Sequence, residues 1–153
     1  MNIEQKIEEL GYKLTTPPKP LASYVPVVKS GEFIFTAGQV PLVDGQLKYS
    51  GKVPLTISEE DAIKAAEICV LNCLSVIKAE IGQLDKIERI VKLTVFVNST
   101  DDYSKQPAIA NGASELLVKI FGDAGKHARS AVGVSSLPLN APVEVEMIVK
   151  LKE

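Results

Sequence analysis

Three observations predict an α+β fold in which two long helices pack on one face of a β-sheet. The expected elements follow the order strands, helix, strand, helix and two further strands. Each helix carries a single apolar stripe, so both stripes have to be buried against the sheet. The length of 153 residues, with 46% hydrophobic and 24% charged residues, fits one domain with its own core. We therefore expect residues 1–153 to form a single domain, in which 1–20 are an N-terminal helix and a proline-rich connector.

The first part of the chain is expected to hold one short helix and two strands. Asn2 to Leu10 has the pattern of a short amphipathic helix. Thr15 to Pro20 (TTPPKP) is a proline-rich, extended connector. Leu21 to Lys29 contains a proline, so it predicts an edge or bulged strand. Phe33 to Val40 (FIFTAGQV) is aromatic and β-branched and predicts a stronger strand, followed by a hairpin-like segment at Asp44-Gly45.

The first long helix is expected to begin at Ser58 and to end at Gly82. Asp61 follows Ser58 by three residues, which gives a start that resembles a capping box. The apolar residues then recur with helical spacing at Ala62, Ala66, Cys69, Val70, Cys73, Leu74, Ile77 and Ile81. Gly82 has the position of a C-terminal glycine cap, so the helix carries one buried stripe between two recognisable ends.

A strand from Ile90 to Asn98 (IVKLTVFVN) and a second long helix follow. Asp101 or Asp102 is expected to cap this helix, which runs to about Phe121. Pro107 either lies in its first turns or separates a short turn from the main helix.

The two cysteines, Cys69 and Cys73, lie four residues apart on the apolar stripe of the first long helix. A redox pair or half of a metal site is one interpretation. A zinc site would need a second pair of Cys or His residues, which the sequence does not contain. Reduced thiols in the core are therefore the favoured interpretation.

The C-terminal stretch predicts two strands with distinct faces. His127 to Ser135 and Val143 to Leu151 alternate, and a Leu-Pro loop joins them. The alternate valines of both strands would form one apolar face. Arg129 would then share the other face with Glu144 and Glu146, among only alanine and glycine neighbours, which suggests open space above the sheet. A binding site is one interpretation of this face, and a solvated face with an incidental Arg–Glu pair is the other.

Composition and charge exclude several classes of function. The formal net charge of −2 gives no global field that would attract nucleic acid or an anionic membrane. There is no apolar run of about 18 residues, and the N-terminus lacks the apolar region of a signal peptide, so we expect a cytoplasmic protein without a membrane span. With both helices on one sheet face, the other face stays uncovered and is expected to mediate self-association.

Four motifs resemble the Rid family, which is also called YjgF or endoribonuclease L-PSP. They are FIFTAGQVP (33–41), LTVFVNSTDDY (93–103), NGASELL (111–117) and above all HARSAVGVSSLPLNAPVEVE (127–146), and the resemblance extends from about residue 21 to the C-terminus. It implies a chorismate-mutase-like fold with a mixed sheet, assembled as a homotrimer with clefts between subunits.

The resemblance also implies an activity, namely hydrolysis of reactive imines or enamines, such as 2-aminoacrylate, to 2-keto acids and ammonia. Arg129 matches the arginine that holds the substrate carboxylate, for which a guanidinium fork is well suited. Glu144 matches the glutamate that positions water or moves protons near the departing amine. Tyr24 and Gly38 match residues that line the cleft, and Asn111 matches an asparagine with a structural role. No metal or cofactor is implied.

Two residues depart from the best-described deaminases of that family. Ala37 stands where serine is common, and Ala131 stands where cysteine is common, so the expected pocket is wider and less polar. A different substrate, or a non-catalytic trimer that binds small carboxylates, is therefore an alternative, and ribonuclease activity has the least support. His127 lies on the face of Arg129 and is either an acid–base group or a residue at the rim of the subunit. Ser130 is expected on the opposite, core-side face.

Overall fold

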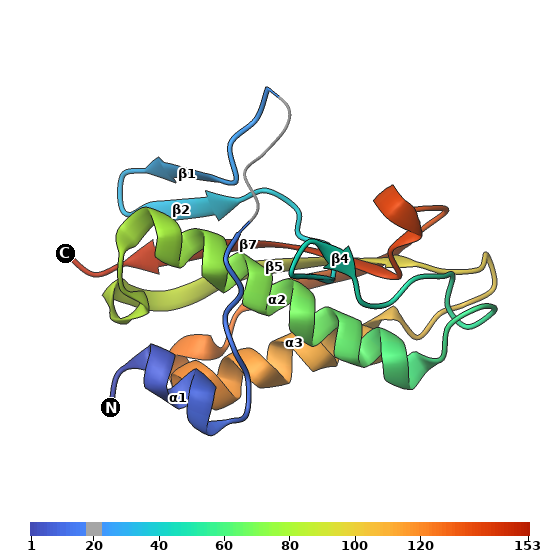
Figure 1. The fold of residues 1–153 in the computed structure, drawn as a ribbon, viewed down its shortest axis with the longest axis horizontal. Helices are drawn as coiled ribbons and strands as arrows, with labels where there is room; N and C mark the ends of the chain where they lie inside the picture. Colours follow the sequence, from blue (N-terminus) through green and yellow to red (C-terminus); the bar gives the residue numbers. More distant parts are fainter. Residues whose placement is uncertain (18–22) are drawn as a thin grey trace.

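The computed structural model describes residues 1–17 and 23–153, and it consists of a helical layer packed on one face of a sheet. Helices α2 (Glu59–Ile81) and α3 (Gln106–Phe121) lie against each other on the same side of the sheet (Figure 1). The predicted α+β arrangement, with two long helices on one face, is thereby confirmed. Residues 18–22, which include the end of the expected connector and the start of the expected 21–29 strand, lie outside the described residues.

The main sheet has five strands in the order β1-β2-β7-β5-β6. Their bounds are Val27–Ser30 for β1, Phe33–Thr36 for β2, Ile87–Asn98 for β5, Ala128–Val134 for β6 and Val143–Leu151 for β7. The pairs β1–β2, β2–β7 and β5–β7 are antiparallel, whereas β5 and β6 are parallel, so the sheet is mixed. A parallel pair needs a crossover, and α3 provides it between β5 and β6. Strand β6 is consequently an edge strand that lies beside α3.

Helix α2 begins and ends where its sequence predicts. The Ser58 hydroxyl accepts a hydrogen bond from the backbone N–H of Asp61 at 3.1 Å, and Gly82 follows the last turn with a φ of 86°. Cys69 and Cys73 are fully buried free thiols whose Sγ atoms donate to the carbonyls of β7. Burial raises the pKa of Cys73 to about 12 and raises that of Cys69 well above its usual value, so both remain protonated core thiols.

Helix α3 begins at Gln106, four residues later than Asp102, so the expected aspartate cap is wrong. The Asp102 carboxylate instead accepts a hydrogen bond from the Thr100 hydroxyl at 2.8 Å within the preceding turn. A helix that started at Asp102 would place Pro107, which lacks an N–H, beyond its first turn. Because the helix starts at Gln106, Pro107 falls in the first turn, where its missing N–H costs no hydrogen bond.

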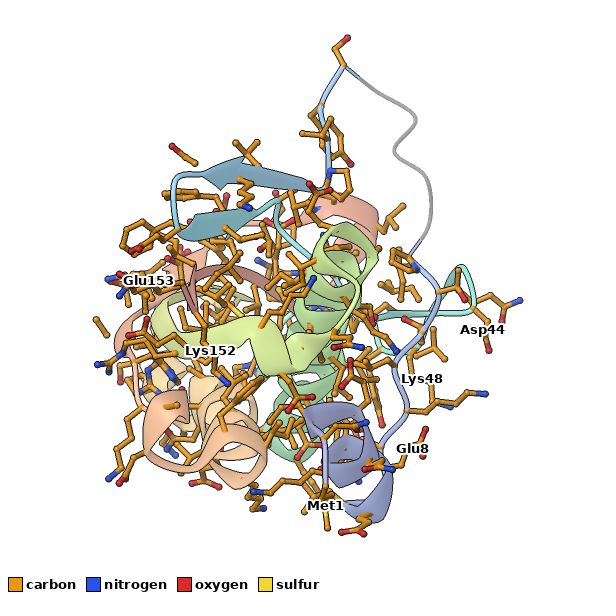
Figure 2. The ribbon with its side chains drawn as sticks, turned by 90° about the vertical axis from the view of Figure 1, so that its left-hand side faces the viewer. Met1, Glu8, Asp44, Lys48, Lys152 and Glu153 are labelled. Atoms are coloured by element: carbon orange, nitrogen blue, oxygen red, sulfur yellow. The ribbon has the colours of Figure 1, made fainter. Side chains whose placement is uncertain are left out.

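The smaller elements complete the helical side. Helix α1 (Ile3–Glu9) is capped by Asn2 and contacts α3. Met1, just before this helix, and Glu8 within it lie on the opposite side of the molecule from β1 and β2 (Figure 2). The hairpin β3 (Leu42–Val43) and β4 (Gln46–Leu47) turns at Asp44 and Gly45, whose φ values are 51° and 77°. Short 3-10 segments η1 (Leu84–Lys86), η2 (Gly122–Gly125) and η3 (Pro138–Asn140) link the larger elements. None of the helices in the described ranges has both the length and the apolarity needed to cross a membrane.

The alternation of β7 assigns its faces as expected. Its odd-numbered residues, Val143, Val145, Met147, Val149 and Leu151, are buried under the helices. Glu144 and Glu146 lie on the other face, which we call the open face because no helix in the described part of the chain covers it. Phe33, Phe35 and Val132 on this face are exposed by 38%, 43% and 44%, so it is a mixed apolar and acidic surface.

The expected faces of β6 are wrong, because its small residues rather than its valines turn toward the helices. Arg129 and Ala131 pair with Leu93 and Val95 of β5, which are fully buried on the helical side. Val132 therefore lies on the open face. The physical reason is the close approach of α3, since a Cβ at Gly133 would come within 2.8 Å of side-chain atoms of Ser99 and Gln106. At position 133 a glycine therefore fits on the helical side and a valine would not.

Candidate functional site

Arg129 extends from edge strand β6 toward α3, where two polar side chains hold it. Its Nη1 donates a hydrogen bond of 2.8 Å to Oδ1 of Asn111 and one of 3.1 Å to Oγ of Ser114. Both hydrogen bonds that Arg129 makes to described residues come from Nη1, so the N–H groups on Nη2 and Nε face no described partner. Two N–H groups on one edge of a guanidinium are the arrangement that binds a carboxylate in a bidentate manner.

Helix α3 supplies both partners because of its periodicity. Asn111 and Ser114 are three residues apart and therefore lie on one face of the helix. The buried residues Ala110, Ala113 and Leu117 occupy the neighbouring positions that pack into the core. Asn111 and Ser114 therefore lie next to the buried face of α3, where the helix contacts β6. Asn111 is expected from the resemblance to have a structural role, whereas Ser114 is not among the predicted site residues, although its three-residue spacing from Asn111 is a usable signal.

His127 joins the same cluster through Ser114. Its Nδ1 lies 2.7 Å from the carbonyl oxygen of Gly125, which can only accept, so Nδ1 carries the proton. In the neutral ring Nε2 is then an acceptor, and the Ser114 hydroxyl donates to it at 2.9 Å. Burial lowers the pKa of His127 and the nearby Arg129 charge adds to this effect, while the bond to Gly125 opposes it. The expectation that His127 lies on the face of Arg129 agrees with this arrangement.

Ala131 and Ser130 lie on opposite faces of β6, next to Arg129 in the chain. Ala131 is half-buried and packs against the core on the side of α3. Ser130 is exposed on the open face, where it accepts a hydrogen bond of 3.2 Å from Lys92 Nζ. The expectation that Ser130 faces the core is therefore wrong, for the same reason that reverses the other residues of this strand.

Glu144 lies on the open face, where it packs against the backbone of Gly38. A Cβ at Gly38 would lie 2.8 Å from Glu144 Cδ and 3.0 Å from Oε1, so only glycine leaves room for the carboxylate in this position. Burial of the half-buried Glu144 raises its pKa, and the neighbouring Glu146 charge adds to the rise. Ala37, the residue before Gly38, donates its backbone N–H to the Pro26 carbonyl at 2.8 Å. Gly38 and Ala37 thus belong to the surroundings of Glu144.

Arg129 and Glu144 do not meet within one chain, which corrects the expectation that they share a face. Arg129 pairs with Leu93 on the helical side, and Glu144 pairs with Phe96 on the open face. Strand β5 lies between their two strands, which separates the residues by about 10 Å across the strands. Their partners on β5 are three residues apart, which adds about 10 Å along the strands, and the two side chains lie on opposite sides of the sheet. Tyr24 precedes β1 at the far edge of the sheet and is 58% exposed. The sequence-predicted residues therefore form two groups, one around Arg129 and one around Glu144.

Among residues 1–17 and 23–153, no group of three or more His, Cys, Asp or Glu side chains is placed to hold a metal ion. The chemistry that these residues offer is carboxylate binding at Arg129, proton transfer at His127 and at Glu144, and hydrogen bonding by Ser114.

Comparisons with known proteins agree on one family. The family model described as "YjgF/chorismate mutase-like, putative endoribonuclease" matches residues 4–151. Protein TCP17 of Trypanosoma cruzi is 39% identical over 150 residues, which are 97% of this chain and 94% of that protein. A 2-iminobutanoate/2-iminopropanoate deaminase of Dermatophagoides farinae is 29% identical, over 91% of this chain and 95% of its own. A crystal structure of an Agrobacterium tumefaciens protein of unknown function matches with a TM-score of 0.93 and 40% identity, over 98% of this chain and 92% of its own.

Proposed function

Because this chain belongs to the YjgF/chorismate mutase-like family, we propose that it hydrolyses imines or enamines of small amino acids to 2-keto acids and ammonia. The observation that carries the proposal is the guanidinium of Arg129, which Asn111 and Ser114 hold through Nη1 while Nη2 and Nε–H face no described partner. The similarity to a 2-iminobutanoate/2-iminopropanoate deaminase supports the same reaction class. A cytoplasmic location remains part of this proposal.

The reaction depends more on orienting the substrate and the attacking water than on strong chemical activation. An imine carbon is already electrophilic, so holding the substrate carboxylate and a water molecule in place supplies much of the acceleration. Arg129 is assigned to the carboxylate. Glu144 is assigned to proton transfer to the departing amine. Its raised pKa lies closer to neutral pH than that of an ordinary glutamate, which favours proton exchange.

The separation of these two residues favours an assembled site. The carboxylate and the imine nitrogen of such a substrate are only a few ångströms apart, so one molecule cannot contact both sides of a sheet. We propose a homotrimer in which Arg129 of one subunit faces Glu144 of a neighbouring subunit. The open face, with exposed Phe33, Phe35 and Val132, is the surface that such an assembly would cover. Gly38 and Ala37 would enter the cleft together with Glu144, and Tyr24 is assigned to its lining.

The two alanines bear on which substrate the cleft takes. Ala131 lies next to Arg129 along the helical side of β6, and Ala37 lies next to Gly38 on the side of Glu144. Neither side chain can donate or accept a hydrogen bond, so the side chain of the substrate would meet methyl groups on both sides. This favours an apolar amino-acid side chain. A trimer that binds 2-keto acids without turnover is the alternative function that the same alanines allow.

The experiment that tests the proposal couples an amino-acid oxidase to the release of ammonia and 2-keto acid. The wild-type protein is expected to speed this release. Arg129→Ala is expected not to do so, and Arg129→Lys, which keeps the charge but not the fork, serves as the matched control with little activity. If the wild type binds 2-keto acids but leaves the release rate of every imine unchanged, the carboxylate-binding trimer replaces the deaminase.

A further inference from the structure

Strand β2 is interrupted within the segment 33–40, for which the sequence predicts one continuous strand. Its regular pairing with β7 ends where Phe35 faces Ile148, and pairing resumes where Gln39 faces Val145. Between these two pairs, three residues of the first strand stand opposite two residues of β7. One extra residue in an antiparallel pair is a β-bulge, a feature that is common beside functional sites.

The extra residue reverses the sides of the sheet that the following side chains face. In β2, Ile34 and Thr36 are buried on the helical side, so regular alternation would also place residue 38 there. Instead, a Cβ at Gly38 would contact the Glu144 carboxylate on the open face. Gln39 correspondingly lines a hollow on the helical side together with residues of α2. Because a shift of one residue exchanges the two faces of a strand, the bulge is what brings Gly38 to Glu144.

The hydroxyl of Thr36 holds this bulge against β7. The backbone N–H of Met147 donates a hydrogen bond of 3.0 Å to Thr36 Oγ1, so a side-chain oxygen takes the place of a backbone carbonyl in the ladder. The hydroxyl in turn donates to Sγ of Cys73 in α2 at 3.8 Å. Thr36 and Met147 are both buried. Loss of the hydroxyl would therefore leave the Met147 N–H without a partner in the core, which is costly.

We propose that Thr36 is a positioning residue for the deaminase reaction, because its hydroxyl maintains the bulge that places Gly38 beside the Glu144 carboxylate. This inference rests on the proposed function. Thr36 lies on the helical side of the sheet, whereas Glu144 lies on the open face, so Thr36 acts on the reaction through the backbone and through Glu144 rather than by touching the substrate.

The alternative register shows what the bulge prevents. If the pairing of Phe35 with Ile148 continued four residues further along each strand, Gln39 would face Glu144. The carboxyl would then lose its packing against the backbone of Gly38 and would meet the side-chain amide of Gln39. Greater exposure and an amide donor both favour the charged carboxylate, so both would lower the pKa of Glu144 from its raised value.

The kinetics of Thr36 variants test this role. Thr36→Val replaces the hydroxyl by a methyl group of similar size, and it is expected to lower kcat by about 10-fold with little change in KM, because Arg129 holds the substrate on its own. Thr36→Ser keeps the acceptor and is expected to keep kcat close to that of the wild type. If Thr36→Val does not fold, Thr36→Ala removes the same acceptor and is compared instead. Thr100→Val is the matched control, since its hydroxyl bonds Asp102 in the turn before α3, and its kcat is expected to equal that of the wild type.

A double variant separates positioning through Glu144 from a general loss of structure. In a Glu144→Gln background, Thr36→Val is expected to lower kcat no further, because the amide at position 144 has no proton transfer left to misplace. If Thr36→Val lowers kcat by the same factor in this background as in the wild type, Thr36 supports the structure as a whole and the proposal is wrong.

Two NMR measurements give readouts that do not depend on turnover. Hydrogen exchange at the Met147 amide is expected to be slow in the wild type and in Thr36→Ser, and faster in Thr36→Val. The pKa of the Glu144 carboxyl is expected to fall in Thr36→Val and to stay raised in Thr36→Ser. An active wild type whose Thr36→Val variant keeps its kcat, or keeps both NMR properties, would overturn the role of Thr36 and leave the proposed function standing. A wild type without deaminase activity would overturn the proposed function and, with it, the role of Thr36 in the reaction.

Discussion

The two groups of site residues differ in how completely one chain builds them. Around Arg129, hydrogen bonds from helix, strand and loop connect Asn111, Ser114, His127 and the Gly125 carbonyl. Around Glu144, the described residues supply no such network, but a gap at Gly38 and a like charge at Glu146. The side chains around Arg129 on the helical side are preorganised. The surroundings of Glu144 on the open face need another subunit or molecule to complete them.

This difference has a structural cause. Strand β6 lies under α3, so its side chains on the helical side meet a helix that can supply fixed partners. The open face of β7 meets no described helix, and the described neighbours of the Glu144 carboxylate are Gly38, Glu146 of its own strand and Phe96 of β5. A site that uses both groups has to be completed by a second copy of the chain, because the sheet itself separates them.

The largest expected effect comes from removing the preorganised anchor. Arg129→Ala removes the guanidinium that binds the carboxylate, and kcat/KM for an imine substrate is expected to fall by about 1,000-fold. The oligomeric state should stay unchanged, which sedimentation or light scattering can measure. If the assembly dissociates instead, Arg129 holds subunits together and its partners on α3 are structural.

On the open face, Glu144→Gln sharpens the comparison. The amide keeps the size of the side chain and loses its ability to exchange a proton, so kcat is expected to fall by about 100-fold with little change in KM. Steady-state kinetics at constant pH measures both values. A rise in KM with kcat retained would make Glu144 a substrate contact rather than a proton-transfer group.

Gly38→Ala is expected to have a smaller effect, on activity rather than on folding. The added Cβ would lie 2.8 Å from Glu144 Cδ, so the carboxylate has to move aside. Since that end of the side chain is flexible, we expect a loss of about 10-fold in kcat with little change in Tm. Ala37→Ser, which adds a hydroxyl one residue earlier, is the control. A large drop in Tm for Gly38→Ala would show that the backbone rather than Glu144 needs the glycine.

The smallest expected effect is on stability and follows from the raised pKa of Glu144. Its folded-state pKa lies above the unfolded value, so its contribution to stability is full at low pH and is lost as the pH rises through the folded pKa. Glu144→Gln is therefore expected to stabilise the protein at pH 8 and not at pH 4. The gain should stay below about 1 kcal/mol, because the carboxyl is half exposed. Denaturant unfolding at the two pH values measures it, and equal shifts would contradict the account.

Much of the fold follows from local patterns. Ser58 and Gly82 mark the ends of α2 because capping is a property of a few adjacent residues. The alternation of β7 assigns its faces because every second residue is a large apolar one. The sequence predicts too early a start for α3, because Asp101 and Asp102 are both residues that commonly cap helices. The helix instead begins at Gln106, which places Pro107 in its first turn.

The candidate site was only half predictable, and β6 shows why. Its alternation separates two sets of residues, but both sets are weakly apolar, and sequence alone favours placing Val132 rather than Ala131 in the core. The closeness of α3 reverses this choice, and that closeness depends on the parallel pairing of β6 with β5. Ser114 was missed for the same reason, because its spacing shows which helix face it occupies but not which strand that face meets.

The central claim is that Arg129 and Glu144 act together only across a subunit boundary. Co-expression of Arg129→Ala and Glu144→Gln chains tests it, since each variant alone is expected to be nearly inactive. If subunits mix at random in equal amounts, about a quarter of the clefts combine an intact Arg129 with an intact Glu144, and about a quarter of wild-type activity should return. Activity that stays at the level of the separate variants would show that both residues come from one chain and would contradict this account.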